Sequence, residues 1–155
     1  MTAFGGHSQA AGLSIKEEDI DAFRIKINDY AKKCFEGKTL TPKLYIDCAI
    51  DTQDISLRAA KIISKLEPFG MSNEVPVFSA SGMRILTVQA MGADGKHLRL
   101  YLSDGKSTFN AVGFNMGEMT GSLKCGDVVS IAFTMNVNVY NGAENLQLIL
   151  KDVKK

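Results

Sequence analysis

The second half of the chain alternates apolar and polar residues with a period of two, the pattern of strands that bury one face. Leu98, Leu100 and Leu102, for example, alternate with polar neighbours. The pattern predicts five strands, at about residues 83–91, 96–103, 107–114, 127–138 and 144–153. Asp-Gly and Asn-Gly pairs, which favour hairpin turns, separate several of these runs. Residues 115–126 lack the alternation and leave room for a short helix. Three strands, a helical or irregular connection and two strands is the order of an OB-fold, a small barrel that commonly binds oligonucleotides.

The beginning of the chain has a helical period instead. Apolar residues recur at steps of three and four between Ile20 and Cys34. Ser14 and Glu17 precede them as a capping-box pattern, and Gly37 follows as a left-handed stop. These signals predict an amphipathic helix over residues 15–36.

A strand and a second helix are predicted next. Alternating apolar residues indicate a strand over residues 44–50, and a helix is expected from about residue 55 until Pro68 ends it. The side chains expected to face inward from that helix are Leu57, Ala60, Ile63 and Leu66. Residues 67–78 contain two prolines and a glycine and are the expected domain boundary. The expected fold class is α+β, with an α/β segment of two helices followed by a five-stranded barrel.

Composition places the chain among ordinary globular proteins. Its 155 residues are 45% hydrophobic and 23% charged, and the formal net charge is +1. No apolar run approaches the roughly 20 residues of a transmembrane helix. A cytoplasmic protein with no membrane partner is therefore expected. Cys34, Cys48 and Cys125 form no C-x-x-C pair, so we expect reduced, partly buried thiols instead of disulfides or a zinc site.

Two stretches carry candidate binding chemistry. Gly5 and Gly6 allow a ligand to approach the backbone, and His7 would donate a hydrogen bond to a phosphate if residues 8–11 began a helix whose free N–H groups attract anions. A glycine turn with a surface histidine is the alternative. In the second strand, Leu98 and its apolar neighbours would face the core, which leaves His97, Arg99 and Tyr101 together on the other face. Single-strand binding uses such a combination of charge and aromatic ring, although outward polar residues also suit any half-exposed strand.

Three motifs in order resemble the RecJ exonuclease family of DHH-type phosphoesterases. The stretch G-G-H-S-Q-A-A-G, residues 5–12, is similar to the substrate-contacting motif of the DHHA1 domain. The stretch L-E-P-F-G, followed by Asn73, Pro76 and Phe78, is similar to the linker of the family. The segments K-H-L-R-L, V-G-F-N and L-Q-L-I, the last followed by Asp152, are similar to its OB domain. Ser72, Glu74 and Tyr140 replace a usual glycine, a usual proline and a frequent tryptophan, which affects loop shape and stacking strength.

The resemblance implies a domain plan and a set of binding residues. Residues 1–50 would be the C-terminal part of a DHHA1 domain, residues 51–78 a linking helix and connector, and residues 79–155 an OB-fold domain. The implied activity is 5′ to 3′ single-strand-specific exonucleolysis in DNA repair and recombination. The residues implied to contact a substrate phosphate or nucleotide are Gly5, Gly6 and His7. Those implied to bind single-stranded DNA are Lys96, His97, Arg99, Tyr101 and Tyr140.

The resemblance also implies where catalysis would occur. The family's two-metal site, with Mg²⁺ or Mn²⁺, is built from Asp and His ligands of a DHH domain, but this sequence has no D-H-H triplet and only two histidines. We therefore expect a C-terminal fragment that is inactive alone and has no catalytic residue, cofactor or metal site. The expected partners are single-stranded DNA and other repair or single-strand-binding proteins. Two alternatives stay open: an OB-type protein-interaction module of a DNA repair protein, and part of another DHH-type oligonucleotide phosphodiesterase.

Overall fold

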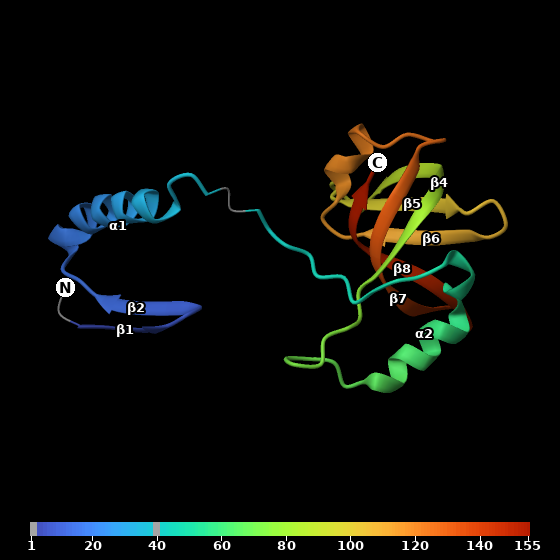
Figure 1. Ribbon diagram of the computed structural model, residues 1–155, viewed down its shortest axis with the longest axis horizontal. Coiled ribbons are helices and arrows are strands. Elements are labelled where there is room, and N and C mark those ends of the chain that lie inside the picture. Colours follow the sequence, from blue (N-terminus) through green and yellow to red (C-terminus); the bar gives the residue numbers. More distant parts are fainter. Residues whose placement is uncertain (1–2, 39–40) are drawn as a thin grey trace. The chain divides into compact units, whose positions relative to one another are not determined.

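The computed structural model describes residues 3–38 and 41–155. The chain divides into two compact units, Met1–Lys43 and Leu44–Lys155, each of which is described by itself (Figure 1).

The first unit consists of a β-hairpin and a helix. Strands β1 (Ala3–His7) and β2 (Ala10–Ser14) pair antiparallel. A 3-10 turn, η1 (Glu17–Asp19), leads into α1 (Ile20–Phe35). Residues 8–11 are the hairpin turn and the start of β2, so the condition of a helix start there is not met. The predicted start of the long helix was wrong, because the 3-10 turn η1 comes first and the regular helix begins only at Ile20, five residues later than predicted.

The end of α1 is as predicted. Gly37 has a φ of 70°, a left-handed conformation that glycine adopts without strain, and the helix stops beside it. The apolar side chains of α1 are largely exposed within this unit; Ile25, Ile27, Tyr30 and Phe35 are examples.

The second unit contains a strand-rich sheet with short helices, so the expected α+β class is confirmed. The long strands are β4 (Phe78–Met91), β5 (His97–Ser103), β6 (Thr108–Gly113), β7 (Val128–Tyr140) and β8 (Ala143–Lys154). They lie where alternation predicted five strands, although β4 begins earlier. The helical turn η4 (Gly117–Gly121) occupies the gap expected between the third and fourth strands.

Strand β4 pairs with two different strands. The sheet order is β3-β4-β5-β6-β8-β7, and β4 pairs with β7 in addition. The first half of β4 lies against β7 and the second half against β5. The register slips between Ala80 and Met83, where Gly82 has a φ of 74°, so the strand is irregular where it changes partner. The pairings among β4, β5, β6, β8 and β7 therefore lead back to β4.

The core of the second unit lies among these strands. Leu98, Leu100 and Leu102 of β5 are fully buried, as are Phe133 of β7 and Leu148 of β8. Inward-facing residues of every long strand meet in this one cluster.

Residues 44–50 form less strand than expected. Only β3 (Cys48–Ala49) pairs with β4, in parallel. The backbone N–H groups of Asp47 and Ile50 donate to Val77 and Ser79, each at 2.9 Å. The preceding apolar residues, Leu44 and Ile46, are exposed because the segment reaches the sheet only after them.

The predicted second helix is present as two consecutive elements, α2 (Leu57–Ile63) and η3 (Ser64–Leu66). A 3-10 turn that was not predicted, η2 (Thr52–Asp54), precedes them. The Ser56 hydroxyl accepts the N–H of Ala59 at 3.1 Å and caps α2. Ala60 is buried as expected, but Leu66 is exposed, because the tighter 3-10 turn at the end moves it off the buried face.

The segment before the sheet packs with the sheet, which differs from the boundary expected at residues 67–78. Ile55 and Ala60 belong to the core of the strands. A hydrogen bond from the Thr52 side chain is the main cause that lowers the pKa of Asp104, in the β5–β6 turn, to about 2. Lys61 of α2 forms an ion pair with Glu144 of β8. The assignment of residues 1–50 to a DHHA1 domain stays a prediction.

The three cysteines are exposed, so the expectation of partial burial was wrong. Cys34 lies on α1, Cys48 on the short edge strand β3, and Cys125 in the turn before β7. Within residues 3–38 and 41–155, no helix has both the length and the apolar character needed to cross a membrane.

We predict that Ile55→Ala destabilises the second unit by roughly 2–5 kcal/mol, because truncating a buried isoleucine removes contacts and leaves a cavity. Ile62→Ala is the matched control, since Ile62 lies in the same segment but is 55% exposed, against 6% for Ile55. Its effect should stay within about 0.5 kcal/mol. Urea denaturation of the full chain measures both, and equal effects of the two changes would contradict the core role of Ile55.

We also predict that residues 44–155 fold alone, whereas residues 79–155 do not. The longer segment keeps Ile55, Ala60 and β3 on the sheet, and the shorter one exposes the core surface that they cover. Amide dispersion in ¹⁵N-correlated NMR spectra distinguishes the two cases. A well-dispersed spectrum of residues 79–155 with unchanged urea stability would restore the boundary at residue 78.

Candidate nucleic-acid interface

The outward face of β5 has the composition that alternation predicted. Leu98, Leu100 and Leu102 are fully buried, and the residues of β5 pair with both neighbouring strands without interruption from Leu98 to Tyr101. Arg99 and Tyr101 therefore project together from the opposite face. Tyr101 is 39% exposed and Arg99 is partly buried.

A row of side chains crosses the same face of the sheet. Cross-strand neighbours share a face, so the register can be followed from strand to strand. Gln89 pairs with Arg99, Arg99 with Val112, Val112 with Ile149, and Ile149 with Thr134. We call these five residues the cross-strand row. It connects β4, β5, β6, β8 and β7.

The middle of the row is apolar and covered. Val112 is only 2% exposed although its pairing with Arg99 places it outside the core cluster. Its neighbours Arg99 and Ile149 shield it from both sides along the row. The row thus has an apolar floor with polar side chains at each end, Gln89 and Arg99 on one side and Thr134 on the other.

Two buried polar atoms beside the row have no hydrogen-bond partner among the described residues. They are Nε of Arg99 and Oδ1 of Asn110. Asn110 pairs with Tyr101, so both atoms lie next to the exposed ring. A buried donor or acceptor without a partner costs about 1–3 kcal/mol. One is a donor and the other an acceptor, and both are covered from solvent by neighbouring atoms in this structure.

A second aromatic group lies at the start of β5. The His97 Nδ1 accepts the backbone N–H of Asn115 at 3.0 Å, which leaves Nε2 as the ring nitrogen able to donate. The His97 ring meets Phe114 edge to face, with centroids 5.3 Å apart. Phe114 is exposed. His97 therefore holds the β6–η4 connection and packs against an exposed ring two residues after Val112.

The other two predicted DNA-contacting residues lie at the ends of strands. Lys96 precedes β5 and its ammonium is 2.8 Å from Asp94, so its charge is already paired. Tyr140 is exposed at the tip of the β7–β8 hairpin, before the Asn141-Gly142 turn. It shares a strand face with Thr134, six residues earlier, about 20 Å along the strand. The structure thus brings Arg99, Tyr101 and His97 together and leaves Tyr140 at a distance.

The Gly5-Gly6-His7 motif lies in the β1–β2 hairpin of the first unit. Gly5 pairs with Gly12, and a Cβ at either position would meet nothing within 4 Å. A Cβ at Gly6 would lie 2.9 Å from the Ala10 carbonyl oxygen, so this glycine is needed by the turn. His7 is exposed at the end of β1. The motif therefore presents open hairpin backbone and an exposed histidine, without a helix N-terminus at residues 8–11.

Four interface residues were missed by the sequence analysis: Gln89, Asn110, Val112 and Phe114. The alternation of β4 and β6 carried a usable signal, because Gln89 and Asn110 occupy outward positions of predicted strands. Their proximity to Arg99 depends on register between strands, which alternation within one strand does not determine. In residues 3–38 and 41–155 there is no group of three or more His, Cys, Asp or Glu side chains placed to hold a metal ion.

Curated proteins similar to this chain share one description. The single-stranded-DNA-specific exonuclease RecJ of Bacillus subtilis is 30% identical over 149 residues, which cover 96% of this chain and 19% of that protein. The enzyme of the same description from Dickeya dadantii is 25% identical, over 97% of this chain and 26% of its own length. The chain thus spans about a fifth to a quarter of these relatives.

Solved structures and family patterns agree with these relatives. The crystal structure of RecJ in complex with Mn²⁺ from Thermus thermophilus has the same fold over 99% of this chain and 22% of its own chain, with a TM-score of 0.75 and 22% identity. A second crystal structure of that protein is a complex with Mg²⁺. The sequence pattern of the RecJ OB domain matches residues 46–152, more than half of the chain. This chain belongs to the RecJ OB domain family.

Proposed function

We propose that this chain is the single-stranded-DNA-binding and substrate-positioning part of a RecJ-type exonuclease that degrades single strands from 5′ to 3′ in DNA repair and recombination. Its relatives are described as single-stranded-DNA-specific exonucleases. Hydrolysis itself would take place in a separate catalytic domain that binds Mg²⁺ or Mn²⁺. The chain's own contribution is to hold the strand, in the cytoplasm.

The proposal depends most on the exposed Tyr101 ring, which shares its face of β5 with Arg99. Arg99 Nε and Asn110 Oδ1 are buried without a partner among the described residues. A nucleotide would pair with these two atoms only after the side chains that cover them moved: its phosphate oxygens and base carbonyls accept, and its base amino groups donate. The Tyr101 ring offers a stacking surface for any base, so recognition would be sequence-tolerant.

The ring of paired strands supports an OB-type barrel. We propose that β4, β5, β6, β8 and β7 are the five strands of that barrel and that β3 is an addition to it. OB-folds bind oligonucleotides on the face of their second and third strands, here β5 and β6. The cross-strand row crosses that face.

We propose a second contact with the substrate in the hairpin of the first unit. Gly5, Gly6 and His7 are proposed to hold a phosphate or nucleotide. In support of this, Gly5 and Gly12 face each other across the hairpin without side chains, so a ligand could approach the backbone closely beside the exposed His7.

We predict that Tyr101→Ala weakens binding of a single-stranded oligonucleotide by roughly 1–3 kcal/mol, the value of one base stack. Tyr45→Ala is the matched control, because Tyr45 is exposed in the same unit but lies far from β5 in sequence and outside the row. Fluorescence anisotropy measures both affinities. An unchanged affinity of the Tyr101 variant, with circular dichroism showing it folded, would remove this face from the DNA-binding surface.

Arg99→Ala should reduce the salt dependence of binding. Each phosphate contact releases counterions, so losing one lowers the slope of log affinity against log salt by about 0.7 for a single strand. Arg58→Ala on the exposed face of α2 should leave the slope unchanged. Titrations at several salt concentrations test this, and equal slopes for wild type and the Arg99 variant would mean that Arg99 contacts no phosphate.

A further inference from the structure

One edge of β7 is open beyond its contact with β4. Strand β4 pairs with β7 only as far as Phe133, whereas β7 continues to Tyr140. From Thr134 onward, β7 pairs only with β8 among the described residues. The other edge of this stretch therefore has no partner strand.

The hairpin turn shows which backbone groups face the open edge. Asn141 and Gly142 have φ values of 50° and 78°, as in the two-residue turn whose flanking residues exchange hydrogen bonds. Tyr140 and Ala143 flank the turn and pair. In an antiparallel ladder, hydrogen-bonded pairs alternate. Counting back from Tyr140, Asn138, Asn136 and Thr134 bond to β8, so the N–H and C=O groups of Met135, Val137 and Val139 point away from it.

Pairing at the other end of β7 leads independently to the same direction for these backbone groups. The Ser79 carbonyl of β4 accepts the N–H of Ile50, so Ser79 faces β3 and its neighbour Phe78 faces β7. Phe78 pairs with Phe133, whose backbone groups therefore point toward β4. The irregularity between β7 and β8 places the extra residue, Lys151, on β8, so alternation along β7 continues unbroken. Met135, Val137 and Val139 thus face the same side as Phe133.

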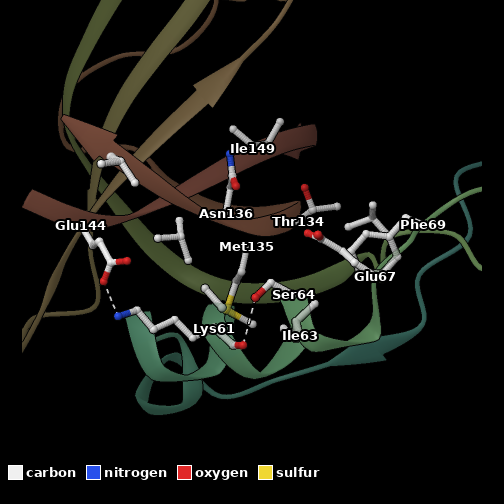
Figure 2. Close-up of a pocket in the computed structure, with 14 residues that line it drawn as sticks. Lys61, Ile63, Ser64, Glu67, Phe69, Thr134, Met135, Asn136, Glu144 and Ile149 are labelled. Carbon is white, nitrogen blue, oxygen red and sulfur yellow. Dashed lines mark hydrogen bonds and ion pairs between the residues drawn. The ribbon is translucent and has the colours of Figure 1, made fainter. Parts of the chain in front are cut away.

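A groove follows this open edge. It has a volume of about 610 Å³, and its lining includes Met135, Val137 and Val139 on one side and residues of α2, η3 and the connector on the other. Figure 2 shows the Met135 side chain directed toward Ser64 and Ile63, with Phe69 at one end of the groove. A single extended segment would fit between β7 and α2, in the place beside β7 that β4 vacates at Phe78. Because α2 and η3 flank the groove, a whole second sheet has less room there.

The charges of the groove favour a basic occupant. Lys61 and Glu144 pair with each other at one end (Figure 2). Glu67, at the other end, makes no ion pair with any described residue. The three charged side chains of the lining sum to −1, which opposes a phosphate backbone or an acidic peptide and attracts a lysine or arginine. Val75, Phe69 and Ile63 offer apolar contacts to the neighbouring side chains of such a segment.

We propose that this groove binds an extended peptide of a partner protein by strand addition to Met135–Val139, with apolar side chains against α2 and a basic side chain near Glu67. Strand addition satisfies the free backbone groups of an edge, and pockets for alternate side chains give specificity. This site adjoins the proposed DNA-binding face at Thr134 and Ile149, but it rests on the open edge of β7, so it would stand if the proposal of DNA binding failed.

Hydrogen exchange on the free full chain tests the edge. The amides of Met135, Val137 and Val139 should exchange much faster than those of Asn136 and Asn138, which bond to β8. Equal protection of both sets would overturn the proposal, because the edge would already have a partner. If that protection came with a concentration-dependent dimer in sedimentation, the occupant would be a second copy of the chain.

A peptide titration tests the occupant. The probe is a capped pentapeptide, Val-Lys-Val-Thr-Val, added to ¹⁵N-labelled full chain. We expect shifts and new exchange protection at the Met135, Val137 and Val139 amides, and their loss when every peptide amide is N-methylated. Absence of shifts at millimolar peptide, or binding that survives N-methylation, would overturn strand addition. Stronger shifts of the same amides with an oligothymidine would assign the groove to nucleic acid instead.

Charge reversal tests the basic side chain. Glu67→Lys should weaken binding of the lysine peptide roughly two- to fivefold, the range of an exposed ion pair, and strengthen binding of a peptide with glutamate in place of lysine. Glu118→Lys, on η4 outside the groove, is the matched control. Equal affinities of both variants for both peptides would contradict the role of Glu67.

Discussion

The arrangement of the second unit depends on the double pairing of β4. This strand of 14 residues pairs with β7 in its first half and with β5 in its second. The irregularity at Gly82 separates the halves, and the inward residues of both halves reach one core. Without that change of partner, the pairings would not lead from β7 back to β4, and the inward residues of β7 would not meet those of β4 along a shared ladder.

Local patterning predicted most of the strands, because alternation and Asx-Gly turns are properties of short segments. It failed where a distant partner decides the outcome. Residues 44–50 alternate, yet only Cys48–Ala49 becomes a strand, because β4 offers pairing there alone. Ile55 belongs to the core of strands that follow it in the sequence, which no linker composition reveals. Pairing between β1 and β2 likewise decides residues 8–11, for which the sequence left a helix start and a glycine turn open.

In the candidate site, too, the pattern within one strand predicted some residues, whereas others depend on pairing between strands. Strand parity placed Arg99 and Tyr101 on one face correctly, because it needs only the burial of Leu98 and Leu100. Asn110 and Val112 join them through register, a relation between strands. Whether Tyr140 lies close to Arg99 could not be inferred from strand parity. Parity tells which face a side chain occupies, but not how far along the strand the side chain lies.

Strand β7 contributes to two surfaces, because its side chains and its backbone groups point in different directions. Its outward side chains, such as Thr134, end the cross-strand row, while the peptide groups of Met135 and Val137 face the groove beside α2. Thr134 and Ile149 also line that groove, so the two surfaces adjoin. Glu67, which forms no ion pair with any described residue, lines the groove beyond them. On the proposal that DNA follows the row from Arg99, this carboxylate would repel a phosphate that entered the groove, because like charges within about 8 Å are only partly screened at physiological salt. The same groove would therefore favour the side of the sheet that carries Arg99 and Tyr101 for the nucleic acid and leave the open edge of β7 to a basic segment.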